Sequence, residues 1–460
     1  MSELAAAGPV TIDRRRLTEL IKREHTLYRA NFPGSWEAFS SSGGHLLGGV
    51  PMTWMRMWAG GFPVYMAAAS GARLIDIDGN EFIDFCLGDT GAMAGHSPVA
   101  VQAALTRRYG EAGGATTMLP TQDAAWVAAE LSRRFGVQHW SFTLTATDAN
   151  RWAIRLARQI TRRQKILVFS YCYHGSVDES FIVVGPDGPQ ARADNVGPPV
   201  DPRETSRVAE FNDAGALERE LAHGDVAAVL MEPALTNIGI VLPEPGYLDA
   251  VRALTRQHGT LLINDETHTF SAGPGGCTAA WGLEPDIVTI GKSIAGGIPA
   301  GANGLAPELT EFILNDPAAD IEDTGGVGGT LAGNALSVAA MRATLEEVLT
   351  DEAFAGMIEV ATRFTAGVQS VLDSRRLPWS IVQLGARAEY RFSPQPPSSG
   401  GESAAAADPQ LDEYLHLYMI NRGVLMTPFH NMALMCPATT EADADAHAEV
   451  FAAAADDLVG

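Results

Sequence analysis

Lysine is nearly absent from this chain of 460 residues, in which only Lys22, Lys165 and Lys292 accompany 29 arginines among the 32 basic residues. Lys292 lies in TIGKSIAGGIPAGANG (residues 289–304), surrounded by glycine and apolar residues. Only an amine condenses with an aldehyde or ketone to form an imine, and arginine cannot replace it in that reaction. The presence of Lys292 therefore has two explanations. Either the protein needs an amine for imine chemistry, or this lysine is present by chance in an arginine-rich chain.

Cysteine is also scarce, and the motifs of several enzyme classes are missing. The four cysteines are far apart and form no CxxC pair, which excludes a dense disulfide framework and a thiolate zinc site and is typical of a reducing cytosol. The chain has no HExxH or GxSxG motif, so zinc proteolysis and serine hydrolysis find no support. We therefore expect no bound metal.

Long apolar runs are missing as well. There is no run of 18 apolar residues, and no basic segment followed by an apolar core stands near the N-terminus. We expect neither a membrane span nor a signal peptide, and we predict a cytoplasmic protein.

Positive charge is outnumbered, with 55 acidic residues against 32 basic ones and a net charge of −23. Such a field repels nucleic acid phosphates and anionic membranes, so we expect neither as a partner and predict small-molecule substrates. Aromatic residues make up only 7% of the chain, while 46% is hydrophobic and 47 residues are glycine. This composition favours an α/β enzyme over a β-sandwich or a disordered scaffold.

Between about 120 and 345, short apolar runs alternate with helical patterns. The runs are KILVF (165–169), VAAVLM (226–231), TLLIND (260–265) and DIVTIG (286–291). Strands that are apolar throughout and separated by helices predict a mainly parallel sheet covered on both faces.

The flanking segments follow other patterns. Residues 71–86 alternate apolar and polar residues around Asp-Gly, which predicts a β-hairpin. We expect a loop at SPQPPSSGGESAAAADP (393–409), because it is rich in proline, serine and glycine. We predict an N-terminal segment over 1–75, a large domain over 76–345 and a small α+β domain over 346–460.

Chemically active residues follow several of the predicted strands. In a parallel α/β sheet ligands gather at the carboxyl ends of the strands, where TLLIND delivers Asp265 and DIVTIG is followed by Lys292. FTLTATDAN (142–150) leads into a helix whose first N–H groups can hold a phosphate. VFSYCYHG (168–175) adds aromatic residues after another strand. An imine-forming lysine, a carboxylate, a phosphate cradle and an aromatic plate together predict pyridoxal 5'-phosphate as the cofactor.

Eight motifs follow one another along the chain, which are GARLIDIDGNEFIDF, AGHSP, TATDAN, YHG, MEP, NDETHT, GKSIAGGIPAG and GTLAGNALSVAA. In these motifs and their order the chain resembles the class III, fold type I pyridoxal-phosphate aminotransferases, and most closely their glutamate-1-semialdehyde-aminomutase-like branch. The resemblance runs from about residue 45 to the end of the chain. The resemblance implies a seven-stranded, mainly parallel sheet in the large domain.

The resemblance also implies roles for single residues. Lys292 is expected to form the imine with the cofactor aldehyde and to shuttle the substrate proton. Asp265 is expected to pair with the ring nitrogen. Ala146 and Thr147 stand where the family binds phosphate through a Gly/Ser pair, although the glycine is missing here. Tyr173 is expected to cover the ring.

Further positions complete the implied cofactor site. Thr330 is expected to reach the phosphate of the neighbouring subunit, which implies a homodimer with active sites at the interface. Glu232 lies at a family position near cofactor and substrate, and His268 stands where many relatives place a glutamine near the phenolic oxygen. His174, next to Tyr173, either helps to position the cofactor or makes a structural hydrogen bond.

The N-terminal substrate segment departs from the family. Relatives that act on carboxylated substrates often have an arginine nine residues before the proline of the FPV-like strand, and Trp54 stands there in this chain. Either Arg56 still reaches a carboxylate from a shifted loop, or the pocket has become apolar and is lined by residues such as Trp58. Arg387 is a second candidate for a carboxylate clamp, with an ion pair as the alternative.

These observations predict a transaminase. It would move an amino group from an amine or amino acid, bulky and apolar or of the ω or β type, to a keto acid or aldehyde such as pyruvate. One alternative is a glutamate-1-semialdehyde-type 2,1-aminomutase, which uses the same lysine and cofactor. A more remote one is a non-catalytic member of the same fold.

Overall fold

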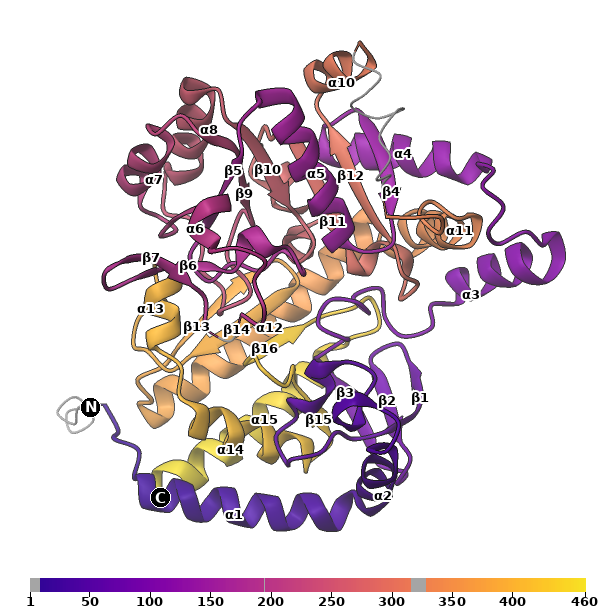
Figure 1. Ribbon diagram of the computed structural model, residues 1–460. Coiled ribbons are helices and arrows are strands. Elements are labelled where there is room, and N and C mark those ends of the chain that lie inside the picture. The colour runs from indigo at the N-terminus through magenta and orange to yellow at the C-terminus, as the bar shows by residue number, and fades with distance from the viewer. Residues whose placement is uncertain (1–8, 194, 316–327) are drawn as a thin grey trace. The chain divides into compact units, whose positions relative to one another are not determined.

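The computed structural model describes residues 9–193, 195–315 and 328–460. The chain divides into two compact units. The small unit comprises Met1–Asp89, Gly356–Pro396 and Ala406–Gly460, and the large unit comprises Thr90–Ala355 and Pro397–Ala405. Residues of the N-terminal third and the C-terminal third thus share the small unit (Figure 1). The three-part division at residues 75 and 345 stays a prediction.

The large unit is built on a seven-stranded sheet with the strand order β4-β12-β11-β10-β9-β5-β8 (Figure 1). Its strands are β4 (His139–Thr143), β5 (Lys165–Phe169), β8 (Ser206–Ala209), β9 (Val226–Met231), β10 (Leu261–Asp265), β11 (Ile287–Gly291) and β12 (Gly301–Leu305). Within this sheet only β12 runs antiparallel to its neighbours. The mainly parallel α/β sheet is therefore confirmed.

The four apolar runs of the sequence form the middle of this sheet as β5, β9, β10 and β11. All six residues of β9 and all five of β11 are buried, which explains why these runs are apolar throughout. Helix α5 (Ala146–Thr161) packs against β9, β11 and β12, while α8 (Tyr247–His258) packs against β10. Burial of the strands' apolar side chains beneath these helices drives assembly of the unit.

Other elements complete the large unit. Further α-helices of the unit are α3 (Val99–Leu105), α4 (Gln122–Phe135), α7 (Ala214–Leu221), α9 (Gly276–Ala280), α10 (Pro307–Leu314), α11 (Ala335–Ala343) and α13 (Gly400–Ala405). Two π-helical segments, Thr106–Ala112 and Thr344–Val348, follow α3 and α11. A four-residue helix, α6 (Pro202–Thr205), and a two-stranded ribbon of β6 (Ile182–Gly185) and β7 (Gly188–Ala191) lie beside β8.

One expectation about the chain's C-terminal third was wrong. The segment 393–409 is not loop throughout, because α13 forms inside it. The Ser399 hydroxyl accepts a hydrogen bond from the Glu402 N–H at 3.1 Å, which caps the first turn. Ser403 is buried and donates to the carbonyl of Ile238. Side-chain capping and a tertiary anchor thus outweigh a composition that is typical of loops.

The small unit contains two further sheets and the terminal helices. One sheet has the order β1-β2-β3-β15 and the other β13-β14-β16. Their strands are β1 (Met66–Ser70), β2 (Arg73–Asp76), β3 (Glu81–Asp84), β13 (Ser380–Leu384), β14 (Arg387–Arg391), β15 (Val424–Leu425) and β16 (Met432–Leu434). Strands β2 and β3 pair antiparallel around Gly79, whose φ is +84°, so the hairpin over 71–86 is confirmed.

Helices of the small unit come from both ends of the chain. They are α1 (Arg14–Asn31), α2 (Pro33–Ser42), α14 (Pro409–Ile420) and α15 (Glu441–Val459), and α1 packs against α14. Helix α12 (Asp351–Arg375) begins in the large unit and continues into the small one. No helix among the described residues is long and apolar enough to cross a membrane.

Candidate active site

The carboxyl ends of β10 and β11 bring together the two residues on which the sequence argument rests. Asp265 ends β10 and pairs in register with Thr289 of the parallel strand β11. Lys292 directly follows Gly291, the last residue of β11. Its φ of +52° is a left-handed conformation that a non-glycine residue seldom adopts, and such residues cluster at functional sites.

Asp265 is a buried carboxylate, 3% exposed, that accepts hydrogen bonds from three donors. One oxygen, Oδ2, accepts from Asn150 Nδ2 at 2.7 Å and from His174 Nδ1 at 2.9 Å. The other, Oδ1, accepts from the Thr267 N–H at 3.1 Å. Burial alone would raise the pKa of this carboxyl, but these donors and the His174 charge hold the pKa below its usual value. Asp265 therefore carries a negative charge at neutral pH.

The start of α5 forms the third part of the site. The Thr145 hydroxyl caps this helix by accepting from the Asp148 N–H. The N–H groups of Ala146 and Thr147 stand in its first turn, where a helix leaves its amides without intrahelical partners. The positive end of the helix dipole adds to their attraction for an anion.

Two glycines bring neighbouring loops close to this helix start. A Cβ on Gly291 would lie 2.8 Å from the nitrogen of Ala146, and one on Gly175 would lie 2.0 Å from Thr147 Oγ1. The Ser176 N–H also donates to Thr147 Oγ1 at 3.2 Å. The residue that precedes Lys292 and the loop after β5 therefore both contact the start of α5.

His268 lies against the lysine. Its Nε2 is 2.5 Å from Lys292 Nζ, and the ring is mostly buried. Because both atoms are nitrogens, the contact requires one of them to donate and the other to accept. The structure therefore brings together Lys292, His268, Asp265 and His174 at neighbouring ends of the central strands.

The other predicted cofactor residues are Tyr173, Glu232 and Thr330. Tyr173 is half-buried in the loop after β5, two residues before Gly175. Glu232 follows the last residue of β9, is buried, and accepts from the Thr236 hydroxyl. Thr330 is exposed in a turn that precedes α11. Their roles toward a cofactor stay predictions.

The predicted substrate residues all belong to the small unit. Trp54 and Arg56 are exposed in a short 3-10 helix, Thr53–Arg56, and the Trp54 ring lies 5.8 Å from that of Phe429. Trp58 is half-buried. Arg387 begins β14 and is only 1% exposed, so it is not a surface residue. Whether any of them contacts a substrate stays a prediction.

Sequence reasoning missed Asn150 and Thr289 as site residues. Asn150 lies in the first turns of α5, in the TATDAN motif, and Thr289 is the register partner of Asp265. The Thr289 hydroxyl donates to Asn150 Oδ1 at 2.6 Å. The signal was an asparagine five residues after a helix cap, at a position that helical spacing turns toward the sheet.

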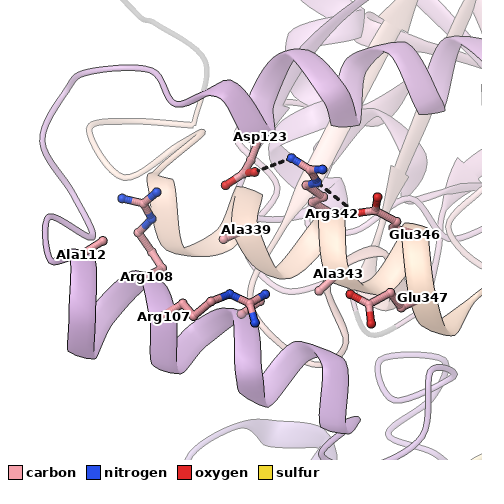
Figure 2. A pocket seen from close by; sticks show the side chains of 10 residues that line it. Arg107, Arg108, Ala112, Asp123, Ala339, Arg342, Ala343, Glu346 and Glu347 are labelled. Atoms are coloured by element: carbon pink, nitrogen blue, oxygen red, sulfur yellow. Dashed lines mark hydrogen bonds and ion pairs between the residues drawn. The ribbon is translucent and has the colours of Figure 1, made fainter.

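A separate cavity of about 390 Å³ lies between α3, α4 and α11 and shares no residue with this site (Figure 2). Three arginines and three carboxylates line it, so its charges balance. Arg342 donates to Asp123 at 3.1 Å and to Glu346 at 3.0 Å. Among the residues that the structure describes, no group of three or more His, Cys, Asp or Glu side chains is arranged to hold a metal.

The residues fit pyridoxal phosphate. Lys292 directly follows β11, and the neighbouring strand β10 ends at the buried, ionised Asp265. The first N–H groups of α5 lie where Gly291 and Gly175 let the neighbouring loops approach closely. The Ser293 hydroxyl, directly after Lys292, is buried with no hydrogen-bond partner among the described residues, so it can serve a bound group. Together with the mainly parallel seven-stranded sheet, this donor set defines a fold type I pyridoxal-phosphate enzyme.

Comparison with known proteins identifies the family. The family model described as aminotransferase class-III matches residues 55–454. A glutamate-1-semialdehyde 2,1-aminomutase of Desulfitobacterium hafniense (strain Y51) is 34% identical over 428 residues, covering 89% of this chain and 95% of the relative. The chain belongs to the class-III aminotransferase family, whose members are pyridoxal-phosphate-dependent enzymes.

Solved structures agree. A glutamate-1-semialdehyde-aminomutase from Pseudomonas aeruginosa PAO1, in complex with PMP, is 46% identical with a TM-score of 0.93, covering 97% of this chain and 99% of that one. A beta-phenylalanine aminotransferase from Variovorax paradoxus is 26% identical with a TM-score of 0.84, covering 95% and 97% of the two chains. An omega-transaminase from Sphaerobacter thermophilus is 28% identical with a TM-score of 0.83, covering 93% and 98%.

Proposed function

We propose that this enzyme is a 2,1-aminomutase that acts on a small amino aldehyde of the glutamate-1-semialdehyde type. The observation that carries the proposal is similarity along nearly the whole chain to two proteins named for this activity, at 34% and 46% identity. The sequence alone favours an intermolecular transaminase, but these similarities support the aminomutase alternative better. In the reaction, the amino group on carbon 2 and the aldehyde oxygen on carbon 1 exchange places, giving 5-amino-4-oxopentanoate.

The proposed mechanism assigns each step to a residue of the large unit. When bound, the cofactor supplies an electron-withdrawing ring that acidifies the carbon carrying the nitrogen. Asp265, ionised and buried, holds the proton of the ring nitrogen. Lys292 Nζ would move a proton between the substrate and the cofactor carbon that carries the nitrogen, delivering one to carbon 1 and removing one from carbon 2. His268 Nε2, 2.5 Å from that amine, orients it. The start of α5 holds the phosphate.

A transaminase is the second candidate. Trp54 stands where relatives that act on carboxylated substrates often have an arginine, and it is exposed beside the Phe429 ring. An aromatic surface of this kind favours bulky amino compounds over an α,ω-dicarboxylate-like substrate. The beta-phenylalanine aminotransferase and the omega-transaminase among the structural relatives support this reading at 26% and 28% identity.

We further propose that the active form is a homodimer in which Thr330 contacts the phosphate held by the second subunit. The exposure of Thr330 in its turn supports this assignment. Its hydroxyl is a suitable donor to a phosphate oxygen. Thr330→Val should then lower cofactor affinity without changing the dimer's sedimentation, and unchanged affinity in this variant would contradict the contact.

The two candidate activities separate in one experiment. The enzyme is incubated with glutamate-1-semialdehyde alone, and in parallel with a panel of amines plus pyruvate. Formation of 5-amino-4-oxopentanoate without any added acceptor supports the aminomutase. Alanine formation in the second set, with no conversion in the first, supports the transaminase and overturns the main proposal.

The same panel with Arg56→Ala and Arg387→Ala tests the substrate residues. Loss of conversion of carboxylated substrates alone, with aromatic amines unaffected, would assign the altered arginine to the carboxylate. Unchanged selectivity would assign it a structural role.

A further inference from the structure

Asn150 uses both its amide nitrogen and its amide oxygen in hydrogen bonds at the candidate site. Its side chain is wholly buried, and its amide nitrogen donates to Asp265 Oδ2 at 2.7 Å and to the His174 carbonyl at 3.1 Å. Its amide oxygen accepts from the Thr289 hydroxyl at 2.6 Å. One side chain on α5 therefore connects the end of β10, the middle of β11 and the loop after β5.

Chemistry fixes the orientation of this amide. An ionised carboxylate and a main-chain carbonyl only accept hydrogen bonds, so the NH2 group must face Asp265 and His174. The Thr289 hydroxyl then donates to the remaining oxygen. Flipping the amide would place oxygen against oxygen at two positions, and each would be a buried unsatisfied contact. Asp265 and the His174 carbonyl thus prevent the flip, and the Thr289 hydroxyl adds a third hydrogen bond that holds the amide in place.

We propose that Asn150 is a positioning residue for the reaction: it fixes the Asp265 carboxylate in the orientation and charge state that the cofactor ring needs, with Thr289 locking the amide. The inference rests on the proposed role of Asp265. A buried carboxylate that loses a charge-assisted hydrogen bond becomes easier to protonate, because the charged form is the one that the donor stabilises. A protonated Asp265 no longer retains a proton on the ring nitrogen.

Two substitutions of Asn150 are expected to change the pH dependence of kcat in opposite directions. Asn150→Ala removes the donor, so Asp265 is protonated at higher pH than in the wild type and kcat falls on the acidic side of the profile. Asn150→Asp places a second carboxyl against Asp265, and the pair shares one proton until the upper of its two pKa values is passed. The activity of Asn150→Asp should therefore fall on the alkaline side of the profile, because there both carboxyls are charged and repel each other.

Asn264 provides the matched control. It precedes Asp265 on β10 and is equally buried, but its amide donates to the Thr278 hydroxyl at 3.1 Å, away from the site. Asn264→Ala and Asn264→Asp report what the same changes do to packing alone. Each variant is purified as the full chain, and its thermal unfolding is measured with and without cofactor, so that loss of folding is recognised.

The readouts are kcat and KM across pH, cofactor affinity of the apoprotein by fluorescence quenching, and the pH dependence of the cofactor's absorbance. We expect Asn150→Ala to lower kcat by about 10- to 100-fold at neutral pH, the range for one hydrogen bond to a charged group, with KM changed less than about threefold. Thr289→Val should lower kcat less than Asn150→Ala does. The variant that combines the two substitutions should have about the same kcat as Asn150→Ala, because both substitutions act on one contact.

Two results would overturn the inference. One is that the Asn150 variants match their Asn264 counterparts in kcat, pH profile and cofactor spectrum. The other is that the fold losses in kcat caused by Thr289→Val and Asn150→Ala multiply in the double variant. Asp265→Asn serves to separate this outcome from failure of the proposed function. If Asp265→Asn is inactive while Asn150 variants are normal, only the positioning role fails. An active Asp265→Asn would instead remove the proposed role of Asp265, and the proposed function itself fails only if the wild type does not convert glutamate-1-semialdehyde.

Discussion

Asp265 and Thr289 occupy one register position on the parallel strands β10 and β11, and Lys292 lies three residues beyond Thr289. The Glu266 N–H donates to the Thr289 carbonyl at 2.8 Å directly after that pair. The carboxylate and the amine are therefore positioned by the same inter-strand hydrogen bonds. A shift of either strand would move both groups out of reach of one ligand.

Lys292→Ala is expected to abolish turnover. No other side chain near the strand ends supplies an amine, so covalent attachment of the cofactor and proton transfer are lost together. The visible absorbance of the bound cofactor near neutral pH should disappear as well. Lys165→Ala is the control, because Lys165 Nζ contacts the Arg203 carbonyl at 2.9 Å on the amino end of β5. Normal activity of Lys292→Ala would contradict the assignment of Lys292 as the amine that forms the imine and transfers the proton.

Asp265→Asn should still bind the cofactor but turn over roughly a hundredfold or more slowly, because a neutral amide does not hold the ring's proton. In the wild type the pKa of Asp265 lies below its usual value, so the group remains ionised as pH falls from neutrality. Loss of its charge should therefore appear only in the far acidic part of the rate profile. Single-turnover absorbance measurements with both proteins follow the chemical step directly.

The fold was predictable because its main signals are local. The runs that form β5, β9, β10 and β11 are apolar throughout, and the Asp-Gly turn specifies the β2–β3 hairpin. Segment 393–409 was misread, because Ser399 caps α13 through a contact that composition does not reveal.

The site was predictable only as a set of strand-end residues. Which side chains meet depends on the register of β10 against β11 and on the packing of α5 across them, and neither is a local property of the sequence. Lys292 and Asp265 stood out because of their chemistry. Asn150 did not, because an asparagine early in a helix is usually a capping or solvent-facing residue.

Gly291→Ala is expected to damage the proposed phosphate cradle at the start of α5. The added Cβ would lie 2.8 Å from the backbone nitrogen of Ala146, closer than carbon and nitrogen approach without a shift. Either the start of α5 or the end of β11 must move, which misplaces the helix N–H groups or Lys292. We expect cofactor affinity to fall by about tenfold or more, since overpacking costs about 1–3 kcal/mol.

Gly110→Ala is the matched control for this substitution. Among the described residues, no atom outside its own helical backbone and chain neighbours lies within 4 Å of the Cβ that it would add, and its backbone is not in the left-handed region. Affinity for pyridoxal phosphate is measured by fluorescence titration of both apoproteins. Equal affinities would mean that the contact between Gly291 and Ala146 does not support cofactor binding.

His447 should make the stability of the protein depend on pH. It is wholly buried on α15 among Phe85, Phe364 and Phe451, and burial lowers its pKa to about 3. Its ring nitrogens have no hydrogen-bond partner within the described part of the chain. Because the native pKa is depressed, the unfolded state binds more protons between pH 3 and about 6.5, so this residue destabilises the fold increasingly as pH falls.

His447→Phe should remove that slope. The wild type is expected to lose about 1.4 kcal/mol of unfolding free energy per pH unit from this residue below pH 6, and the variant should lose none of that share. Urea unfolding at several values between pH 5 and pH 8 measures the difference, with the change in slope as the readout. Any overpacking by phenylalanine shifts the whole curve equally and leaves the slope comparison intact. Parallel curves for the two proteins would mean that His447 is protonated in the native state as readily as in the unfolded chain.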